Sequence, residues 1–186
     1  MLDFGRDLCT DPHFSTNREW LVTNGIGGYA SGTMAGVLTR RYHGRLLAAL
    51  QPPVGRTLLL AKLDETATCV GAAYPLFADR WDDGRINPQG YHHLERFHLD
   101  GTTPVWTFAL ADARLEKRVW MQQGANTTYV TYHYTRGSEP IELAIQALIN
   151  QRDHHANSRA GDWLAHIKSV AHGLGITLGE VAPPLY

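Results

Sequence analysis

A strict alternation between Ile141 and Ile149 is the sequence feature that most constrains how this chain folds. Ile141, Leu143, Ile145, Ala147 and Ile149 occupy every second position. Successive side chains of a β-strand point to opposite faces, so this spacing places an unbroken apolar row on one face. The segment predicts a strand with that face in a hydrophobic core.

Further short strands are predicted between residues 18 and 150, in segments rich in β-branched and aromatic residues. They cover residues 41–50, 57–70, 105–111, 114–121 and 127–134. Gly, Pro, Asn and Asp mark turns between them, as in Asp82-Asp83-Gly84. Many short strands at this spacing predict a mainly β chain, folded as an antiparallel β-sandwich.

The end of the chain shows a different pattern. Four apolar residues are separated by four, three and four positions: Trp163, Ile167, Val170 and Leu174. This spacing predicts a short C-terminal helix, which Asp162 can cap and Gly173 or Gly175 can end. We therefore expect a β-sandwich module over residues 1–160, and a short helix with a connection over residues 161–186.

Composition narrows the classes of function. The net charge is −1, so the sequence lacks the clustered basic charge that nucleic-acid binding requires. The two cysteines, Cys9 and Cys69, form neither a disulfide framework nor a metal-binding spacing. The first residues do not show the pattern of a signal peptide, and no apolar run reaches membrane-spanning length. We expect a cytoplasmic protein with no cofactor, no metal, no nucleic-acid partner and no membrane partner.

Gly25-Ile26-Gly27-Gly28-Tyr29-Ala30 formally fits the G-x-G-x-x-A dinucleotide fingerprint. That fingerprint functions only where a helix follows, and Ser31-Gly32-Thr33 begins a helix poorly. Glycine also permits positive φ angles and close approach of the backbone to a neighbour. The glycines therefore indicate tight turns between packed strands, or a loop that reaches an interface.

The segment Arg40-Arg41-Tyr42-His43-Gly44 gathers polar side chains. If residues 41–50 form a strand, Arg41, His43 and Arg45 share one face. Such side chains can hydrogen-bond hydroxyl-rich ligands. A polar solvent-facing surface or a contact with another domain fits the same residues.

Taken together, residues 19–47 resemble the opening of bacterial and archaeal glycogen debranching enzymes. The resemblance extends over roughly residues 15–160, because other short strings agree in order and spacing. These strings are Pro52–Thr57, Lys62–Thr66, Ile86–Tyr91, Leu115–Met121 and Arg152–His155.

The resemblance implies a supersandwich-like amino-terminal module followed by a catalytic barrel of α/α hairpins. It implies an amylo-α-1,6-glucosidase, a glycoside hydrolase that removes glucose at branch points during glycogen catabolism. The catalytic acids of that family lie in the barrel, so we expect no catalytic residue in this chain. The ending Val181–Tyr186 contains two prolines and suggests a piece cut near a module boundary.

Self-contained hydrolysis would require two carboxylates held about 5–10 Å apart across a cleft. The candidates are Glu19, Asp64, Glu65, Asp82, Asp83, Glu95 and Asp153. Asp64 and Glu65 would point opposite ways on a strand, and nothing in the sequence pairs the others. The neighbouring histidines His92-His93 and His154-His155 would diverge in the same way.

Three functions remain open: a glucan-binding module of a debranching glucosidase, a purely structural module of that enzyme, and a free-standing carbohydrate-binding protein. In the first two the partner is the C-terminal catalytic barrel of the same protein, and the ligand is α-glucan such as glycogen or maltooligosaccharides. The candidate contacts to glucan or to the barrel are Trp20, Asn24, Tyr29, Arg41, Tyr42, His43 and Tyr91.

Overall fold

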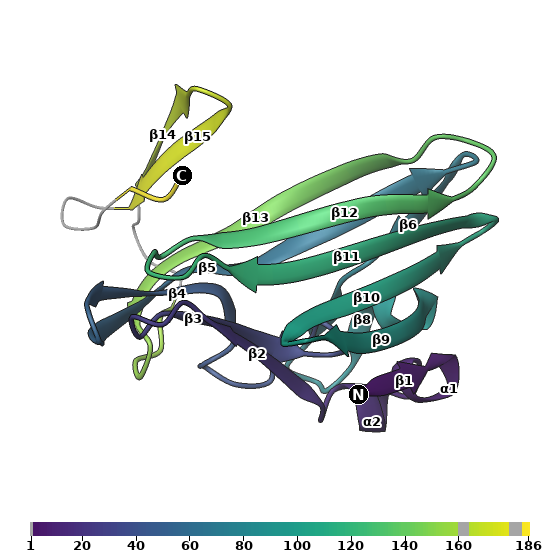
Figure 1. The fold of residues 1–186 in the computed structure, drawn as a ribbon, viewed down its shortest axis with the longest axis horizontal. Helices are drawn as coiled ribbons and strands as arrows, with labels where there is room; N and C mark the ends of the chain where they lie inside the picture. Colours follow the sequence, from purple (N-terminus) through teal and green to yellow (C-terminus); the bar gives the residue numbers. More distant parts are fainter. Residues whose placement is uncertain (1, 160–163, 179–183) are drawn as a thin grey trace.

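A computed structural model describes residues 2–159, 164–178 and 184–186 of the chain. Antiparallel strands form two main sheets whose inner faces enclose one hydrophobic core (Figure 1). The prediction of a mainly β, antiparallel chain is therefore confirmed.

The first sheet has five strands, and each pairs antiparallel with its neighbour. In pairing order they are β1 (Asp3–Gly5), β9 (Leu94–Asp100), β10 (Thr103–Leu110), β11 (Ala113–Met121) and β12 (Thr128–Arg136). The predicted hairpin of residues 105–121 is β10 and β11, with Leu110 opposite Ala113 at its turn.

The second sheet has six strands and includes the predicted strand after Ile141. In pairing order they are β13 (Glu142–Asp153), β5 (Val54–Cys69), β4 (Gly44–Gln51), β3 (Tyr29–Thr33) and β2 (Glu19–Thr23), and β6 (Ala72–Pro75) pairs with β5.

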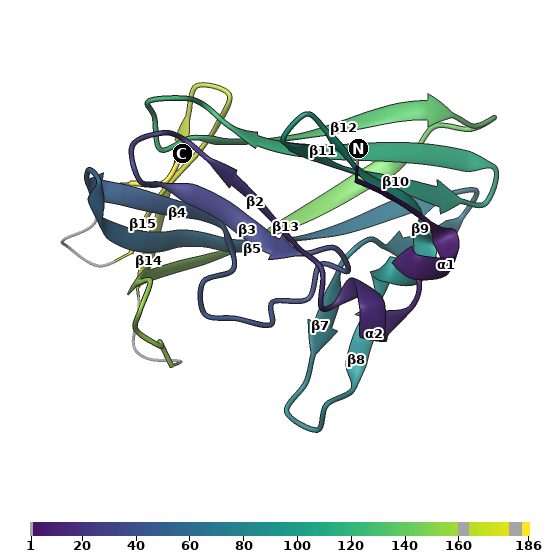
Figure 2. The ribbon, with the colours of Figure 1, turned by 60° about the horizontal axis from the view of Figure 1, so that its bottom comes forward.

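Short elements surround the two sheets. They are α1 (Arg6–Cys9), α2 (Pro12–Ser15), the 3₁₀ turn η1 (Gly90–His93), and the hairpin of β7 (Ala78–Arg80) and β8 (Ile86–Gln89). Figure 2 shows this hairpin projecting beyond the sheets. Within the described ranges, no helix is long and apolar enough to span a membrane.

Strand β11 shows how the sequence pattern builds the core. Every second residue from Ala113 to Met121 is buried, and the residues that alternate with them are only partly buried. This is the period of two that a strand with one core-facing side requires. The central member of the buried row is Lys117, so a charge occupies a core position.

Strand β13 carries the apolar row that most constrained the sequence, and the row is only partly covered. Ile145 pairs with Glu65, whose side chain lies between the sheets, so the row points inward as predicted. Ile145 is nevertheless 47% exposed, because β13 is the edge strand of its sheet. The alternation predicted the strand and its inward face, but not the depth of burial.

The predicted C-terminal helix is wrong in the part that the structure describes. The chain there forms a hairpin of β14 (Ala165–Val170) and β15 (Gly173–Leu178), which Figure 1 shows beside the sandwich. Ile167 pairs directly with Ile176, and His172 takes a positive φ of 63° in the turn. The β-branched residues favour this pairing, and Gly173 begins a strand instead of ending a helix. Asp162 and Trp163 lie outside the described residues.

A buried ion pair crosses the gap between the sheets. The ammonium group of Lys117 on β11 contacts Glu65 Oε1 on β5, and the Tyr132 hydroxyl donates to the same oxygen over 2.7 Å. Burial lowers the pKa of Lys117 to about 8, although the charge of Glu65 acts to raise it. Burial alone would raise the pKa of Glu65, but the charges of Lys117 and Arg45 outweigh it and leave that pKa lowered. Lys117 and Glu65 are therefore both charged at neutral pH, and each charge stabilises the charged form of the other.

Replacing Lys117 by Met should destabilise the fold by about 3 kcal/mol, because it leaves the Glu65 carboxylate buried without its main counter-charge. Urea unfolding measures this loss. Arg85→Met is the matched control, because the pair of Arg85 with Asp83 is exposed and surface pairs contribute little. Equal stability of Lys117→Met and the wild type would show that the buried pair does not stabilise the sandwich.

Candidate functional site

The glycine-rich segment forms the turn between β2 and β3. The backbone N–H of Asn24 donates to the backbone oxygen of Gly28 over 3.2 Å. Gly25 and Gly27 take φ angles of 77° and 102°. A Cβ atom on Gly27 would lie 2.4 Å from the carbonyl oxygen of Pro53. Glycine is therefore required both by the backbone angles and by close packing against the β4–β5 turn.

The buried side chain of Asn24 stabilises this turn, because both its carbonyl oxygen and its NH₂ group form hydrogen bonds. Its Oδ1 accepts from the amides of Ile26 (3.1 Å) and Gly28 (2.9 Å), and its Nδ2 donates to Ala125 O and Asn126 Oδ1, both at 3.0 Å. Asn126 in turn bonds both backbone groups of Ala49. Two asparagines thus join the turn to the β11–β12 connection and to β4.

The Arg-Arg-Tyr-His segment is a turn before β4, and not the strand that the sequence predicted. Strand β4 begins at Gly44, so Arg41, His43 and Arg45 do not alternate on one strand face. Arg40 Nε lies 2.6 Å from Glu19 Oε1 on β2, and His43 Nε2 lies 3.3 Å from the same oxygen. The ion pair between Arg40 and Glu19 and the burial of His43 fix this turn against β2.

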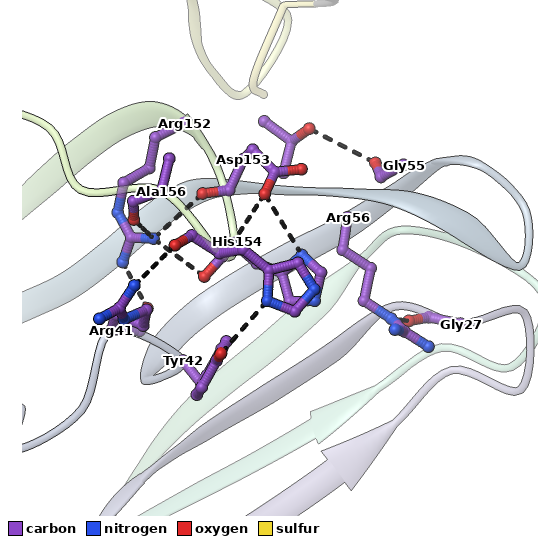
Figure 3. A network of polar contacts seen from close by, with 11 residues as sticks. Gly27, Arg41, Tyr42, Gly55, Arg56, Arg152, Asp153, His154 and Ala156 are labelled. Atoms are coloured by element: carbon purple, nitrogen blue, oxygen red, sulfur yellow. Dashed lines mark hydrogen bonds and ion pairs between the residues drawn. The ribbon is translucent and has the colours of Figure 1, made fainter.

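A second polar network joins this turn to the end of β13 (Figure 3). Arg41 Nη1 donates to His155 O over 2.8 Å, and the Tyr42 hydroxyl lies 3.2 Å from His155 Nδ1. The Arg152 guanidinium donates to the carbonyl oxygens of Arg41 and Ala156. Figure 3 also shows Arg56 Nε reaching Gly27 O, a contact of 2.7 Å. Segments more than one hundred residues apart therefore form one surface.

An open hollow of about 580 Å³ lies over the outer face of β2 and β3, bordered by the glycine turn, by Arg40 and Tyr42, and by Arg56. Its side chains combine two phenols, apolar surface and paired charges, and include Glu19, Leu21, Tyr29, Arg40, Tyr42 and Arg56. Burial raises the pKa of the Tyr29 phenol, although the nearby charges of Arg56 and Arg152 act to lower it. Its phenol is therefore protonated at neutral pH. We call this feature the β2–β3 hollow.

Comparison with known proteins assigns the chain. The family model described as "Glycogen debranching enzyme N terminal" matches residues 18–186. The chain belongs to this family. No curated protein and no solved structure matches it. The match begins one residue before β2, so it includes every segment that encloses the hollow.

In this debranching-enzyme N-terminal domain, three of the predicted contact residues reach the surface together. Arg41 and Tyr42 are exposed, and Tyr29 is partly buried. Tyr29 and Tyr42 both line the hollow, and Arg41 lies beside it in the second network. This grouping brings the glycine-rich segment and the Arg-Arg-Tyr-His segment into one site.

The other four predicted contact residues are buried, so they cannot touch a surface ligand in this structure. Their exposed fractions are 4% for Trp20, 0% for Asn24, 3% for His43 and 2% for Tyr91. Trp20 packs edge-to-face on Trp106 at 5.3 Å, so it contributes to the lining of the hollow only through the 4% of its surface that is exposed. Tyr91 packs on His92 in η1. Strand alternation turns Trp20 inward, and a motif match does not reveal that direction.

Sequence reasoning missed Arg56 and Arg152 as site residues. Both stood in strings that resembled the family, which was the only signal available for them. Their contacts join distant segments through backbone carbonyls, and sequence spacing does not predict such contacts. The predicted absence of a metal site stays a prediction, although no group of three metal-ligating side chains occurs among the described residues.

Asn24→Ala should destabilise the domain by about 2–4 kcal/mol, because it leaves the buried backbone amide of Gly28 and the partly buried one of Ile26 without acceptors. Urea unfolding and amide hydrogen exchange at Gly28 measure the effect. Asn17→Ala is the control, because it removes only an exposed bond to His13 O. Unchanged exchange at Gly28 would refute the role given to Asn24.

Proposed function

We propose that this debranching-enzyme N-terminal domain binds α-glucan in the β2–β3 hollow. The catalytic partner in this proposal is a C-terminal α-1,6-glucosidase barrel of the same protein, acting on cytoplasmic glycogen. The observation that carries the proposal is the pair of tyrosines, Tyr29 and Tyr42, in a hollow bordered by charged side chains.

The side chains of the hollow suit a neutral, hydroxyl-rich ligand. A tyrosine ring offers apolar surface with a polar edge, which matches the apolar face and hydroxyl rim of a sugar ring. Arg56 provides N–H donors beyond the one used on Gly27, and Glu19 provides acceptor oxygens beside Arg40. Glu19 and Arg40 are paired with each other, so the hollow presents no single uncompensated charge there.

The hollow is also held in shape before any ligand arrives. Asn24 fixes the glycine turn, Arg56 fixes Gly27, and Arg152 fixes the backbone at Arg41. A preformed site loses less conformational entropy on binding, so more of the contact energy appears as affinity.

The chemistry in this proposal belongs to the partner domain. Glu19 is the carboxylate that lines the hollow, and it is paired with Arg40, with His43 Nε2 at 3.3 Å. The nearby Asp153 accepts from the His155 amide over 2.8 Å. Both carboxylates thus have structural roles, which supports binding in preference to hydrolysis by this domain.

A contact with the catalytic domain is the second candidate function, and Leu21 favours it. This side chain is 58% exposed at the hollow, and exposed apolar surface is typical of protein contacts. Glucan binding is preferred because Leu21 lies beside two phenols and a guanidinium that also suit sugar hydroxyls.

Tyr42→Ala and Tyr29→Ala should each weaken binding of a maltooligosaccharide roughly tenfold, about 1.4 kcal/mol, as expected for one aromatic contact. Isothermal titration calorimetry on the 186-residue chain measures this. Tyr129→Ala is a matched control, because Tyr129 is 42% exposed and Tyr42 is 39% exposed, but Tyr129 lies on the other sheet.

Equal affinities of the wild type and both hollow variants would overturn glucan binding at this site. Absence of glucan binding by the wild type, together with weaker association of Tyr42→Ala with the separately produced catalytic domain, would establish the second candidate instead.

A further inference from the structure

The segment from Leu38 to Tyr42 is an exposed loop that supplies two side chains of the hollow, Arg40 and Tyr42. Its ends are tied to β3 by hydroxyl groups. Thr33 Oγ1 donates to Val37 O over 2.7 Å, and Ser31 Oγ donates to Tyr42 O over 3.0 Å. We call it the Leu38–Tyr42 loop.

The buried imidazole of His43 binds the backbone of this loop at Thr39. His43 is 3% exposed, and its Nδ1 accepts a hydrogen bond of 3.1 Å from the Thr39 amide. An amide N–H can only donate, so Nδ1 carries no proton and the proton of the neutral ring sits on Nε2. That nitrogen lies 3.3 Å from Glu19 Oε1, without meeting the geometry of a hydrogen bond.

Three charged groups on different elements face the imidazole. Glu19 comes from β2, Arg40 from the loop itself and Arg45 from β4. Glu19 favours a charged imidazole, whereas both arginines oppose it. Arg40 already pairs with Glu19 at 2.6 Å, so a second positive charge must share a carboxylate that is in use.

We propose that His43 is a proton-sensitive latch for the Leu38–Tyr42 loop. Protonation of Nδ1 turns the acceptor of the Thr39 amide into a donor, so two N–H groups face each other and the hydrogen bond is lost. The Thr39 backbone is then released, whereas Arg41 and Tyr42 keep their bonds to Arg152, His155 and Ser31. Arg40, next to Thr39 and now competing with a charged imidazole for Glu19, is the side chain of the hollow that changes position. The latch depends on the fold alone, whereas its effect on ligand affinity rests on the proposed glucan-binding function.

The direction of the pH response follows from the surroundings of the ring. Burial is the main cause that lowers the pKa of His43; Glu19 raises it, and Arg40 and Arg45 lower it further. The folded chain therefore binds this proton less readily than the unfolded chain, whose ordinary value is 6.5. The neutral His43 therefore contributes its full stabilisation when the pH is above 6.5, the pKa in the unfolded chain. This stabilisation decreases as the pH falls below 6.5 and is lost once the pH is below the lowered pKa of the folded chain. The latch is closed at neutral pH and opens in acid.

The experiment follows Thr39 and His43 by nitrogen-15 NMR between pH 8 and pH 5. The imidazole resonances report the tautomer and the protonation, and amide hydrogen exchange, corrected for its intrinsic pH dependence, reports the Thr39 bond. We expect an Nε2–H tautomer at pH 8, and a loss of Thr39 protection of at least tenfold as the ring becomes protonated.

His43→Asn is the matched variant. The Oδ1 of asparagine lies about as far from the backbone as Nδ1 of histidine, and it accepts a hydrogen bond without titrating. Thr39 protection in this variant should not change with pH. An Nδ1–H tautomer in the wild type, or Thr39 protection that persists after the ring is protonated, would overturn the latch.

Calorimetry with a maltooligosaccharide at pH 7.5 and pH 5.5 separates the two proposals. The wild type should lose affinity at pH 5.5, and His43→Asn should retain it. Absence of binding at both pH values, with the NMR result as expected, would leave the latch standing and refute the glucan-binding function. Equal wild-type affinity at both pH values would overturn the link between the latch and the hollow.

Discussion

The charge of Lys117 imposes the constraint on which the sandwich depends. It occupies a core position on β11, and a buried ammonium group is unstable without a counter-charge. Glu65 supplies that charge from β5 in the opposite sheet, and Tyr132 shares the same carboxylate. The two sheets must therefore pack with these strands opposite each other. Nearby, Arg45 lies over the Trp20 ring at 4.9 Å, so the same buried region supports β2 and the floor of the hollow.

The β2–β3 hollow is held together largely by side chains that bond backbone groups. Asn24, Asn126, Arg56 and Arg152 each bond amide or carbonyl groups of a segment distant in the chain. Except for Arg56, which also lines the hollow, these side chains fix the path of the backbone from outside it. Tyr29 lines the hollow, and Tyr42 keeps 39% of its surface exposed there although its hydroxyl contacts His155. This arrangement supports the binding role proposed for the hollow.

Much of the fold was predictable because strand alternation is a local property. The strand over residues 114–121 and the apolar row from Ile141 to Ile149 were both predicted, and the structure contains β11 and places the row on β13 facing inward. The error over residues 165–174 has a physical cause. Apolar residues at spacings of four and three fit one helix face, but Ile167 also fits a strand in which it pairs with Ile176. Pairing between strands is not a local property, so the spacing could not decide between them.

The candidate site was predictable in part. The glycine and Arg-Arg-Tyr-His segments were identified from the sequence, but Trp20 and His43 proved to be buried supports, and Arg56 and Arg152 were not identified as site residues.

The sequence by itself determined the strand-rich character of the chain, the strands whose faces turn to the core, and the family resemblance. The tertiary structure alone decided which polar residues meet at the hollow, because side chains from distant strands become neighbours only when the sheet register and the buried charge pair are set.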